Sequence, residues 1–180
     1  MTLTGADEFG DPCRGCRYNW TEPAAQIQRT HRLVHDALDA LTVADFNRSG
    51  AGLSWSVGEY ICHIGDNERI WAERFAAIDA QTRSVSIAPF DQDLLAAARN
   101  YNLIGYASGM WSMRRGFDDF TTTSHEAARR SGILRHPERG ALPILDAMRT
   151  VVHDCHHHLH DIRRILADDR SVTNDLKHPH

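Results

Sequence analysis

The chain has 180 residues with a formal net charge of −4, and 42% of the residues are hydrophobic while 24% are charged. This length fits one domain with a real core, and the slightly acidic balance offers no basic surface for nucleic acid. No apolar stretch approaches the roughly 18 to 20 residues that span a bilayer, and no signal-peptide pattern opens the sequence, so we expect a cytoplasmic protein without a membrane partner.

Residues 1–21 are rich in glycine, aspartate and proline and lack hydrophobic periodicity, which predicts an irregular N-terminal arm. Pro23 then favours a helix start, because proline suits the first turn of a helix. A helix is expected over residues 22–42, with apolar residues spaced along one face. These residues are Ile27, Val34, Leu38 and Leu41.

A second helix is expected over residues 57–80, because Ser56 and Glu59 have the spacing of a capping box, in which each side chain binds a backbone amide at the helix start. Its inward positions are Ile61, Ile64, Trp71 and Phe75. A third helix is predicted over residues 94–120, preceded by the acidic Asp91 and continuous despite its glycines.

A fourth helix is expected over residues 144–167, where Pro143 stands at a favourable first-turn position. No segment from 41 to 180 has the pattern of a β-hairpin. Four long amphipathic segments without a strand signal predict an all-α protein. We expect a four-helix bundle over residues 22–170, which follows the irregular N-terminal arm and precedes a flexible tail over residues 171–180.

Histidine is unusually frequent, with twelve in the chain and five of them between His153 and His160. On a helix, His158 falls within the apolar stripe that faces the core, and Asp154 lies at its edge one turn earlier. An aspartate and a histidine at i and i+4 supply two ligands to one side of a cation. His63, among apolar positions of the second helix, would supply a third. The alternative is a core histidine satisfied by an acidic neighbour.

Several motifs together resemble the DinB-like (YfiT-like) family of bacterial metal-binding bundles, particularly its actinobacterial branch. They are CRGC, WSVGEYICHIGD, FDQD, HPERG and VVHDCHHHLHDI. In this family one histidine follows a W-x-x-x-E helix start and two ligands come from H/E-x-x-x-H, so the resemblance implies a metal bound by His63, Asp154 and His158. Aspartate replaces the usual histidine or glutamate, which leaves open a register with His153 and His157 as ligands.

Members of this family include thiol S-transferases that use mycothiol or bacillithiol, and mycothiol-dependent maleylpyruvate isomerases. The resemblance therefore implies a divalent metal, for which zinc is the first candidate and nickel and iron are alternatives, and a low-molecular-weight thiol such as mycothiol. We expect a metal-dependent enzyme of the thiol S-transferase type, rather than a hydrolase or isomerase, acting on a small electrophile. The alternative is a non-catalytic metal-binding or stress-associated protein. A small-molecule substrate is the expected partner, and a homodimer is left open.

A second metal site is predicted in the N-terminal arm, where Cys13 and Cys16 have the C-x-x-C spacing of a structural zinc site. Two histidine pairs with i, i+4 spacing could complete this site. They are His31 with His35, and His153 with His157 if the arm folds across the fourth helix.

Four further residues lie close to the expected ligands in the sequence. Asp66 and Asp161 each lie three residues beyond a predicted ligand and could orient its imidazole. Cys155 falls in the apolar stripe of the fourth helix and is interpreted as core filling. The role of Cys62 is left open.

Overall fold

The computed structural model describes residues 15–78, 80–137 and 139–175, with side chains described as far as residue 167. Four long helices dominate this described part of the chain, which confirms the predicted all-α four-helix bundle. They are α2 (Ala24–Asp39), α4 (Val57–Ala76), α6 (Tyr106–Arg129) and α7 (Ile144–Asp175). Shorter elements lie in the connections: α3 (Val43–Phe46), β1 (Ser84–Ser86), α5 (Gln92–Ala98), the 3₁₀ turn η1 (Tyr101–Leu103), β2 (Ile133–His136) and β3 (Gly140–Pro143).

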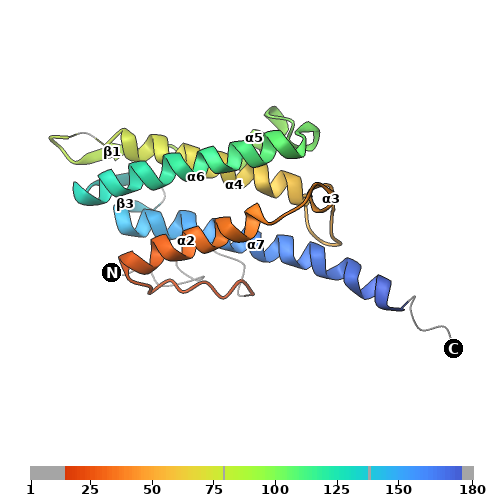
Figure 1. Cartoon of the computed structure of the whole chain (residues 1–180). Coiled ribbons are helices and arrows are strands. Elements are labelled where there is room, and N and C mark those ends of the chain that lie inside the picture. The colour runs from red at the N-terminus through yellow and green to blue at the C-terminus, as the bar shows by residue number, and fades with distance from the viewer. Residues whose placement is uncertain (1–14, 79, 138, 176–180) are drawn as a thin grey trace.

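The bundle consists of two pairs of helices. Figure 1 shows α4 beside α6 in the upper pair and α2 beside α7 in the lower pair, and contacts between α4 and α7 join the two pairs. Apolar side chains on the facing sides are excluded from solvent, among them Ile61 of α4, Phe120 of α6 and Val152 of α7. Their burial is the main favourable contribution to folding.

The backbones of α4 and α6 touch where two glycines face each other. A Cβ atom added at Gly116 would lie 2.4 Å from the carbonyl oxygen of Gly65, and one added at Gly65 would lie 2.8 Å from the Cα of Met113. No side chain fits between backbones that are this close. The two glycines therefore hold α4 directly against α6.

A capping box fixes the start of α4 as the sequence predicts. The Ser56 hydroxyl accepts a hydrogen bond from the Glu59 amide at 3.3 Å, and the Glu59 carboxylate accepts one from the Ser56 amide at 2.8 Å. The apolar stripe that follows, with Ile61 and Ile64 fully buried, sets the rotation of α4 about its axis. His63 consequently points into the bundle and is 1% exposed.

The prediction of one continuous helix over residues 94–120 is wrong. The structure contains two helices, α5 and α6, and α6 continues to Arg129. Asn100 between them adopts a left-handed conformation with φ 52°, which asparagine tolerates better than most residues. The buried Tyr101 then donates a 2.7 Å hydrogen bond to the buried carboxylate of Asp66 on α4. This tertiary contact outweighs the helix propensity of the segment.

The prediction that residues 41–180 contain no hairpin is also wrong. β2 and β3 form an antiparallel hairpin, and β1 pairs with β2 in parallel, in the order β1-β2-β3. Leu134 and Leu142 face each other across the hairpin and are fully buried, whereas Ile133 is exposed. This alternation covers only four residues in each strand, so the polar turn residues around it dominate the sequence pattern.

The final helix is longer than expected. It begins directly after Pro143 as predicted and continues beyond residue 167 to Asp175. No helix in the described part of the chain combines the length and the apolar character that a membrane span requires.

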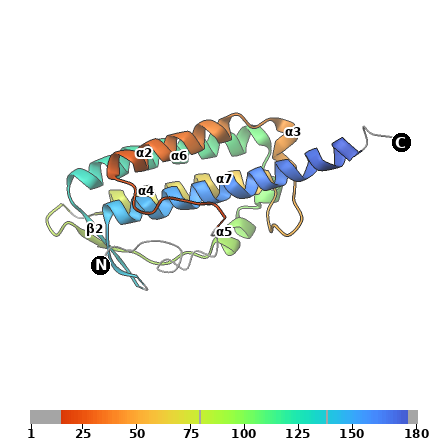
Figure 2. The ribbon, with the colours of Figure 1, turned by 90° about the horizontal axis from the view of Figure 1, so that it is seen from below.

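The arm residues that the structure describes lie along α7, as Figure 2 shows from below. Arg149 of α7 donates a 3.0 Å hydrogen bond to the backbone carbonyl of Glu22. Tyr18 and Trp20 pack edge to face, with ring centroids 5.1 Å apart, and both contact the ring of His153. These contacts place the arm beside the histidine-rich part of α7.

Candidate metal centre

Three candidate ligands converge between α4 and α7. The Nε2 atom of His63 lies 3.3 Å from one carboxylate oxygen of Asp154, and the Nε2 atom of His158 lies 3.5 Å from the other. The three ligand atoms all lie within 4.8 Å of one another. Both histidines are buried, whereas the Asp154 side chain is 29% exposed. The structure thus brings together the ligand set predicted from the sequence.

Neighbouring side chains hold these groups in place. Asn67, one turn after His63 on α4, donates a 2.8 Å hydrogen bond to Asp154. The ring of Tyr60 packs against His158 with centroids 5.0 Å apart, and the rings of His63 and His158 meet edge to face at 4.8 Å. Each candidate ligand is therefore oriented by a second contact.

His158 and Asp154 stabilise each other's charged forms. Burial opposes protonation of His158, but the carboxylates of Asp154 and Asp161 raise its pKa to about 9. Burial would likewise raise the pKa of Asp154, but His158 and His63 hold it well below its usual range. In the absence of a cation, the favoured state is therefore a carboxylate paired with an imidazolium.

The donor set fits a divalent transition-metal ion. Among the described residues, the buried Nε2 atom of His158 makes no hydrogen bond, although it lies 3.5 Å from Asp154. A buried polar atom without a hydrogen bond is costly, and ligation of a cation by the neutral imidazole would remove this cost. Two imidazoles and one carboxylate are also the ligands of several zinc enzymes, in which a fourth position stays open.

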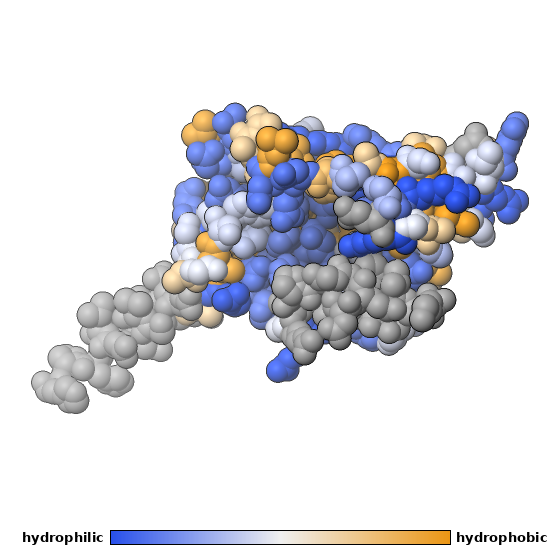
Figure 3. Space-filling view, turned by 180° about the vertical axis from the view of Figure 1, so that it is seen from behind, coloured by the Kyte–Doolittle hydropathy of each residue, from blue (hydrophilic) through white to orange (hydrophobic). Residues whose placement is uncertain are grey.

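A cavity of about 390 Å³ adjoins the three candidate ligands. This volume lies within the range of small-molecule sites. Besides His63, Asp154 and His158, the cavity is lined by Trp20, Asn67, Trp71, Phe90, Gln92, Arg139, Thr150, His153 and His157. Figure 3 shows the back of the molecule, whose recessed centre is hydrophilic.

Cys16 lies against the histidine pair at 153 and 157. Its Sγ atom is 3.7 Å from the Nε2 atom of His153, and the ligand atoms of Cys16, His153 and His157 lie within 4.8 Å of one another. Of the two pairs proposed to complete an arm site, the structure brings this one to Cys16. It also places these histidines in a group separate from His63. Cys13 lies outside the described residues.

The other histidine pair lies in a different buried group. His31 and His35 of α2 contact Glu68 of α4, and the Sγ atom of Cys155 lies 3.5 Å from the same carboxylate. Burial would raise the pKa of Glu68, but the two imidazoles lower it to about 2. Cys155 is fully buried as expected, yet it contacts a charged group in addition to filling the core.

The two carboxylates expected to orient imidazoles differ in their contacts. Asp161 lies 3.9 Å from the Nδ1 atom of His158 and 3.3 Å from the Nε2 atom of His157. Asp66 instead accepts a hydrogen bond from Tyr101 and pairs with two arginines. Its carboxylate therefore supports the connection between α5 and α6, not an imidazole.

Sequence reasoning missed Asn67 and Glu68. Glu68 lies seven residues after Ile61 and three before Trp71, which puts it in the inward stripe of α4. A charged residue within an apolar stripe is a signal that could have identified it. Asn67 follows His63 by one turn, but this spacing alone places it only on the same face of the helix.

Comparison with known proteins agrees with the fold. YfiT from Bacillus subtilis, described as "a probable metal-dependent hydrolase with an unusual four-helix bundle topology", has a TM-score of 0.66 and 14% sequence identity, with 81% of this chain and 86% of that chain covered. At this identity the likeness shows the fold alone. No curated protein matches the chain. The model of the DinB superfamily matches residues 26–162, which include the whole candidate ligand set, and the chain therefore belongs to the DinB superfamily.

Proposed function

We propose that the chain is a metal-dependent enzyme in which His63, Asp154 and His158 hold a divalent cation, zinc by preference. One observation carries this proposal: three metal-ligating atoms from two helices meet beside a cavity of about 390 Å³. Three protein ligands leave a coordination position for substrate, as in catalytic rather than structural zinc sites.

A cation in this place would act as a Lewis acid and make a thiol or a water molecule a stronger nucleophile near neutral pH. The chain's own groups have separate tasks. Asn67 fixes the orientation of Asp154 through its 2.8 Å hydrogen bond. Trp71 and Phe90 line the cavity and limit the access of water, and Arg139 adds a positively charged residue to the lining.

We further propose that the nucleophile is a low-molecular-weight thiol, such as mycothiol, and that the substrate is a small electrophile. The cavity has room for much more than water, and its aromatic and cationic walls suit a ligand with apolar and charged parts. In the transfer, the thiol loses its proton, its sulfur bonds to the electrophilic carbon, and the leaving group departs with its bonding electrons. Water is the alternative nucleophile, in keeping with the description of YfiT.

The second candidate is a non-catalytic metal-binding protein. Three further groups of metal-ligating side chains among the described residues favour this alternative, and one of them offers four protein ligands, enough to enclose an ion completely. The group at His63 differs from them because all three of its members line the cavity. That difference is why an enzyme is the better proposal.

The test combines metal analysis with two assays of the zinc-loaded protein, one with mycothiol and a halogenated electrophile and one with ester substrates but no thiol. The proposal predicts conjugation by the wild type and by His160→Ala, whose imidazole does not line the cavity, and none by His158→Ala. Turnover only in the thiol-free assay would assign a hydrolase instead. Bound metal without turnover or a thiol-dependent thermal shift would support the non-catalytic alternative.

A further inference from the structure

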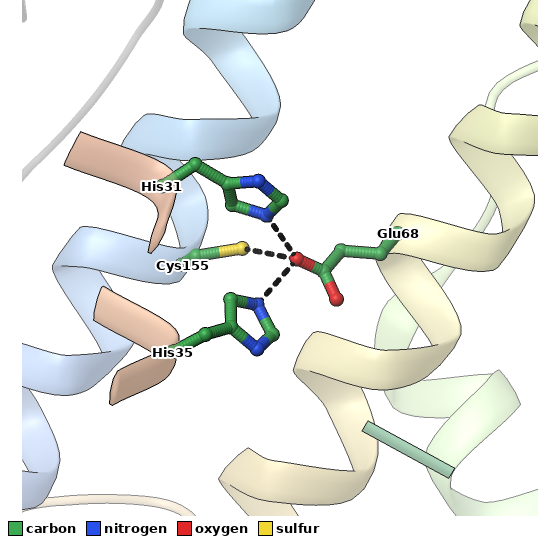
Figure 4. A group of neighbouring side chains, drawn as sticks. All are labelled: His31, His35, Glu68 and Cys155. Carbon is green, nitrogen blue, oxygen red and sulfur yellow. Dashed lines mark hydrogen bonds and ion pairs between the residues drawn. The ribbon is translucent and has the colours of Figure 1, made fainter. Parts of the chain in front are cut away.

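Four metal-ligating side chains meet in the interior of the bundle, and none of them lines the cavity of the candidate metal centre. They are His31 and His35 of α2, Glu68 of α4 and Cys155 of α7, drawn in Figure 4. The two histidines are each 4% exposed, and the other two residues are 0% exposed. Three helices thus bring together one thiol, one carboxylate and two imidazoles, all of them buried. We call these residues the core cluster.

The core cluster converges on a single atom. The Nε2 atoms of His31 and His35 lie 2.5 Å and 2.7 Å from the Oε1 atom of Glu68, and the Cys155 sulfur lies 3.5 Å from it. Figure 4 shows both rings and the sulfur pointing at this oxygen. The second oxygen, Oε2, is buried and makes no hydrogen bond to any described residue. All three groups contact Oε1, and Oε2 is left without a hydrogen bond from any of the described residues. Burial of a carboxylate in this arrangement is energetically unfavourable.

Among the described residues, the charge of Glu68 is balanced by imidazoles alone. Within the described part of the chain, its ion-pair partners are the two imidazoles, and no lysine or arginine pairs with it. A buried carboxylate is expensive unless it is paired with a cation or coordinates a metal. The core cluster therefore offers a place where a cation would be stabilised.

We propose that His31, His35, Glu68 and Cys155 form a second, structural metal site for a borderline transition-metal ion such as Zn²⁺. Two neutral imidazoles, one carboxylate and one thiolate carry a total charge of −2, which balances a divalent cation in the low-dielectric core. Binding forms four coordinate bonds and releases the Cys155 thiol proton to solvent. Four protein ligands without an open position are characteristic of structural rather than catalytic sites.

The distances between the ligand atoms of the core cluster allow a metal ion to bind after a small movement of the imidazoles. At metal–ligand distances of about 2.0 to 2.3 Å, tetrahedral ligands lie roughly 3.3 to 3.8 Å apart. The imidazoles must therefore move away from Glu68 by about 1 Å. His31 borders a cavity of about 90 Å³ and His35 borders a groove of about 480 Å³, both of which reach the half-buried Phe117. Rotation of Phe117, which packs on both rings, would give an ion access.

The test uses the full chain with the other two candidate sites removed by Cys13→Ser, Cys16→Ser and His158→Ala. Titrated with Co²⁺, this background protein should bind one equivalent and show a thiolate-to-cobalt charge-transfer band in the near ultraviolet. Adding Cys155→Ser should abolish the band. Adding Cys62→Ser should leave it unchanged, because Cys62 is buried away from the core cluster and lines a different groove.

Circular dichroism checks that each variant keeps its helical content. If Cys155→Ser does not fold, X-ray absorption of the zinc-loaded background protein decides the question without a change at Cys155. The proposal expects one sulfur scatterer at about 2.3 Å. A background protein that retains no metal, a metal shell without sulfur, or a charge-transfer band that survives Cys155→Ser would each overturn it. None of these outcomes depends on His63, Asp154 or turnover, so this proposal and the proposed function fail independently.

Discussion

Asn67 donates a 2.8 Å hydrogen bond to Asp154, and the next residue on each helix, Glu68 and Cys155, also lie in contact at 3.5 Å. Successive residues of a helix point about 100° apart. The first pair therefore lines the cavity, where Asp154 is a candidate ligand, and the second pair belongs to the core cluster. The interface between α4 and α7 lies between two groups of metal-ligating side chains.

The hydrogen bond from Asn67 should matter for metal affinity. Asn67→Leu keeps the size of the side chain but removes the donor that orients Asp154, so we expect metal affinity to fall about 10- to 100-fold. Asn102→Ala serves as the control, because this asparagine is exposed and does not line the cavity. Competition with a chromophoric chelator measures both values. Equal affinities in the two variants would show that Asn67 does not position the carboxylate.

The ligand register on α7 can be tested with neighbouring substitutions. His158→Ala should abolish metal binding at the site beside the cavity, and Asp154→Ala should weaken it strongly, because both atoms face His63. His157→Ala should matter much less there, since His157 belongs to the group with Cys16. Metal analysis should be done with Cys13, Cys16 and Cys155 already replaced by serine, so that only the site beside the cavity is counted. Loss of metal in His157→Ala but not in His158→Ala would reverse the assignment.

Replacement of Cys13 and Cys16 by serine should remove about one zinc equivalent and loosen the arm while the bundle stays folded. The reason is that a site made with His153 would anchor the arm to α7 and would not build the core. Limited proteolysis near Trp20 reports on the arm, and circular dichroism reports on the bundle. Cys62→Ser provides the matched control. Unchanged zinc content in the double variant would exclude a zinc site in the arm.

Metal-free protein should lose stability as the pH rises from about 6.5 to about 9. The pKa of His158 is raised from 6.5 to about 9, so its charged pairing with Asp154 contributes fully below pH 6.5 and is lost as the pH passes the folded-state value. Urea unfolding of chelator-treated protein across this range measures the effect. His158→Gln should flatten the decline, and an identical slope in this variant would contradict the assignment.

Metal affinity should show the opposite dependence on pH. A proton and a cation compete for the same ring nitrogen of His158, so affinity should rise with pH until about pH 9. Isothermal titration calorimetry in buffers of different ionisation enthalpy counts the protons released when the metal binds. An affinity that is constant from neutral pH to about pH 9 would mean that this imidazole is not a ligand.

Gly116→Ala should destabilise the fold by about 1 to 3 kcal/mol or more, because the added methyl group meets the Gly65 carbonyl oxygen and must push α6 away from α4. Gly105→Ala is the matched control, since a Cβ atom there meets nothing within 4 Å. Gly105→Ala should lower the free energy of unfolding clearly less than Gly116→Ala does. Thermal unfolding compares the two, and equal melting temperatures would refute close backbone packing at Gly116.

The sequence predicted those helices whose apolar pattern extends over many residues. The apolar stripes of α2, α4 and α7 extend over several turns, and the capping box at Ser56 specifies one helix start. The break at Asn100 was not predictable in this way, because it depends on the buried contact between Tyr101 and a carboxylate far away in sequence. The hairpin around Leu134 was missed because each strand supplies only four residues.

The candidate sites differ in the same way: spacing within one helix is predictable from the sequence, whereas contacts between distant segments are not. The pairing of Asp154 with His158 follows from helical spacing on one element, so the sequence alone could predict it. The core cluster combines residues of three helices, and although the apolar stripe around Glu68 marks it as a buried charge, that pattern does not reveal its partners on the other two helices. Which histidine pair meets Cys16 likewise depends on the path of the arm over α7, and spacing carries no information about that path.

The contact between Gly65 and Gly116 also bears on how relatives of this chain could come to accept different molecules. Because the backbone of α6 stands directly behind α4, the wall that carries His63 has no space into which it could recede. Trp20, Phe90 and Arg139, which also line the cavity, come from segments outside the long helices. Exchange of these segments during evolution could therefore alter substrate preference while the metal ligands keep their positions.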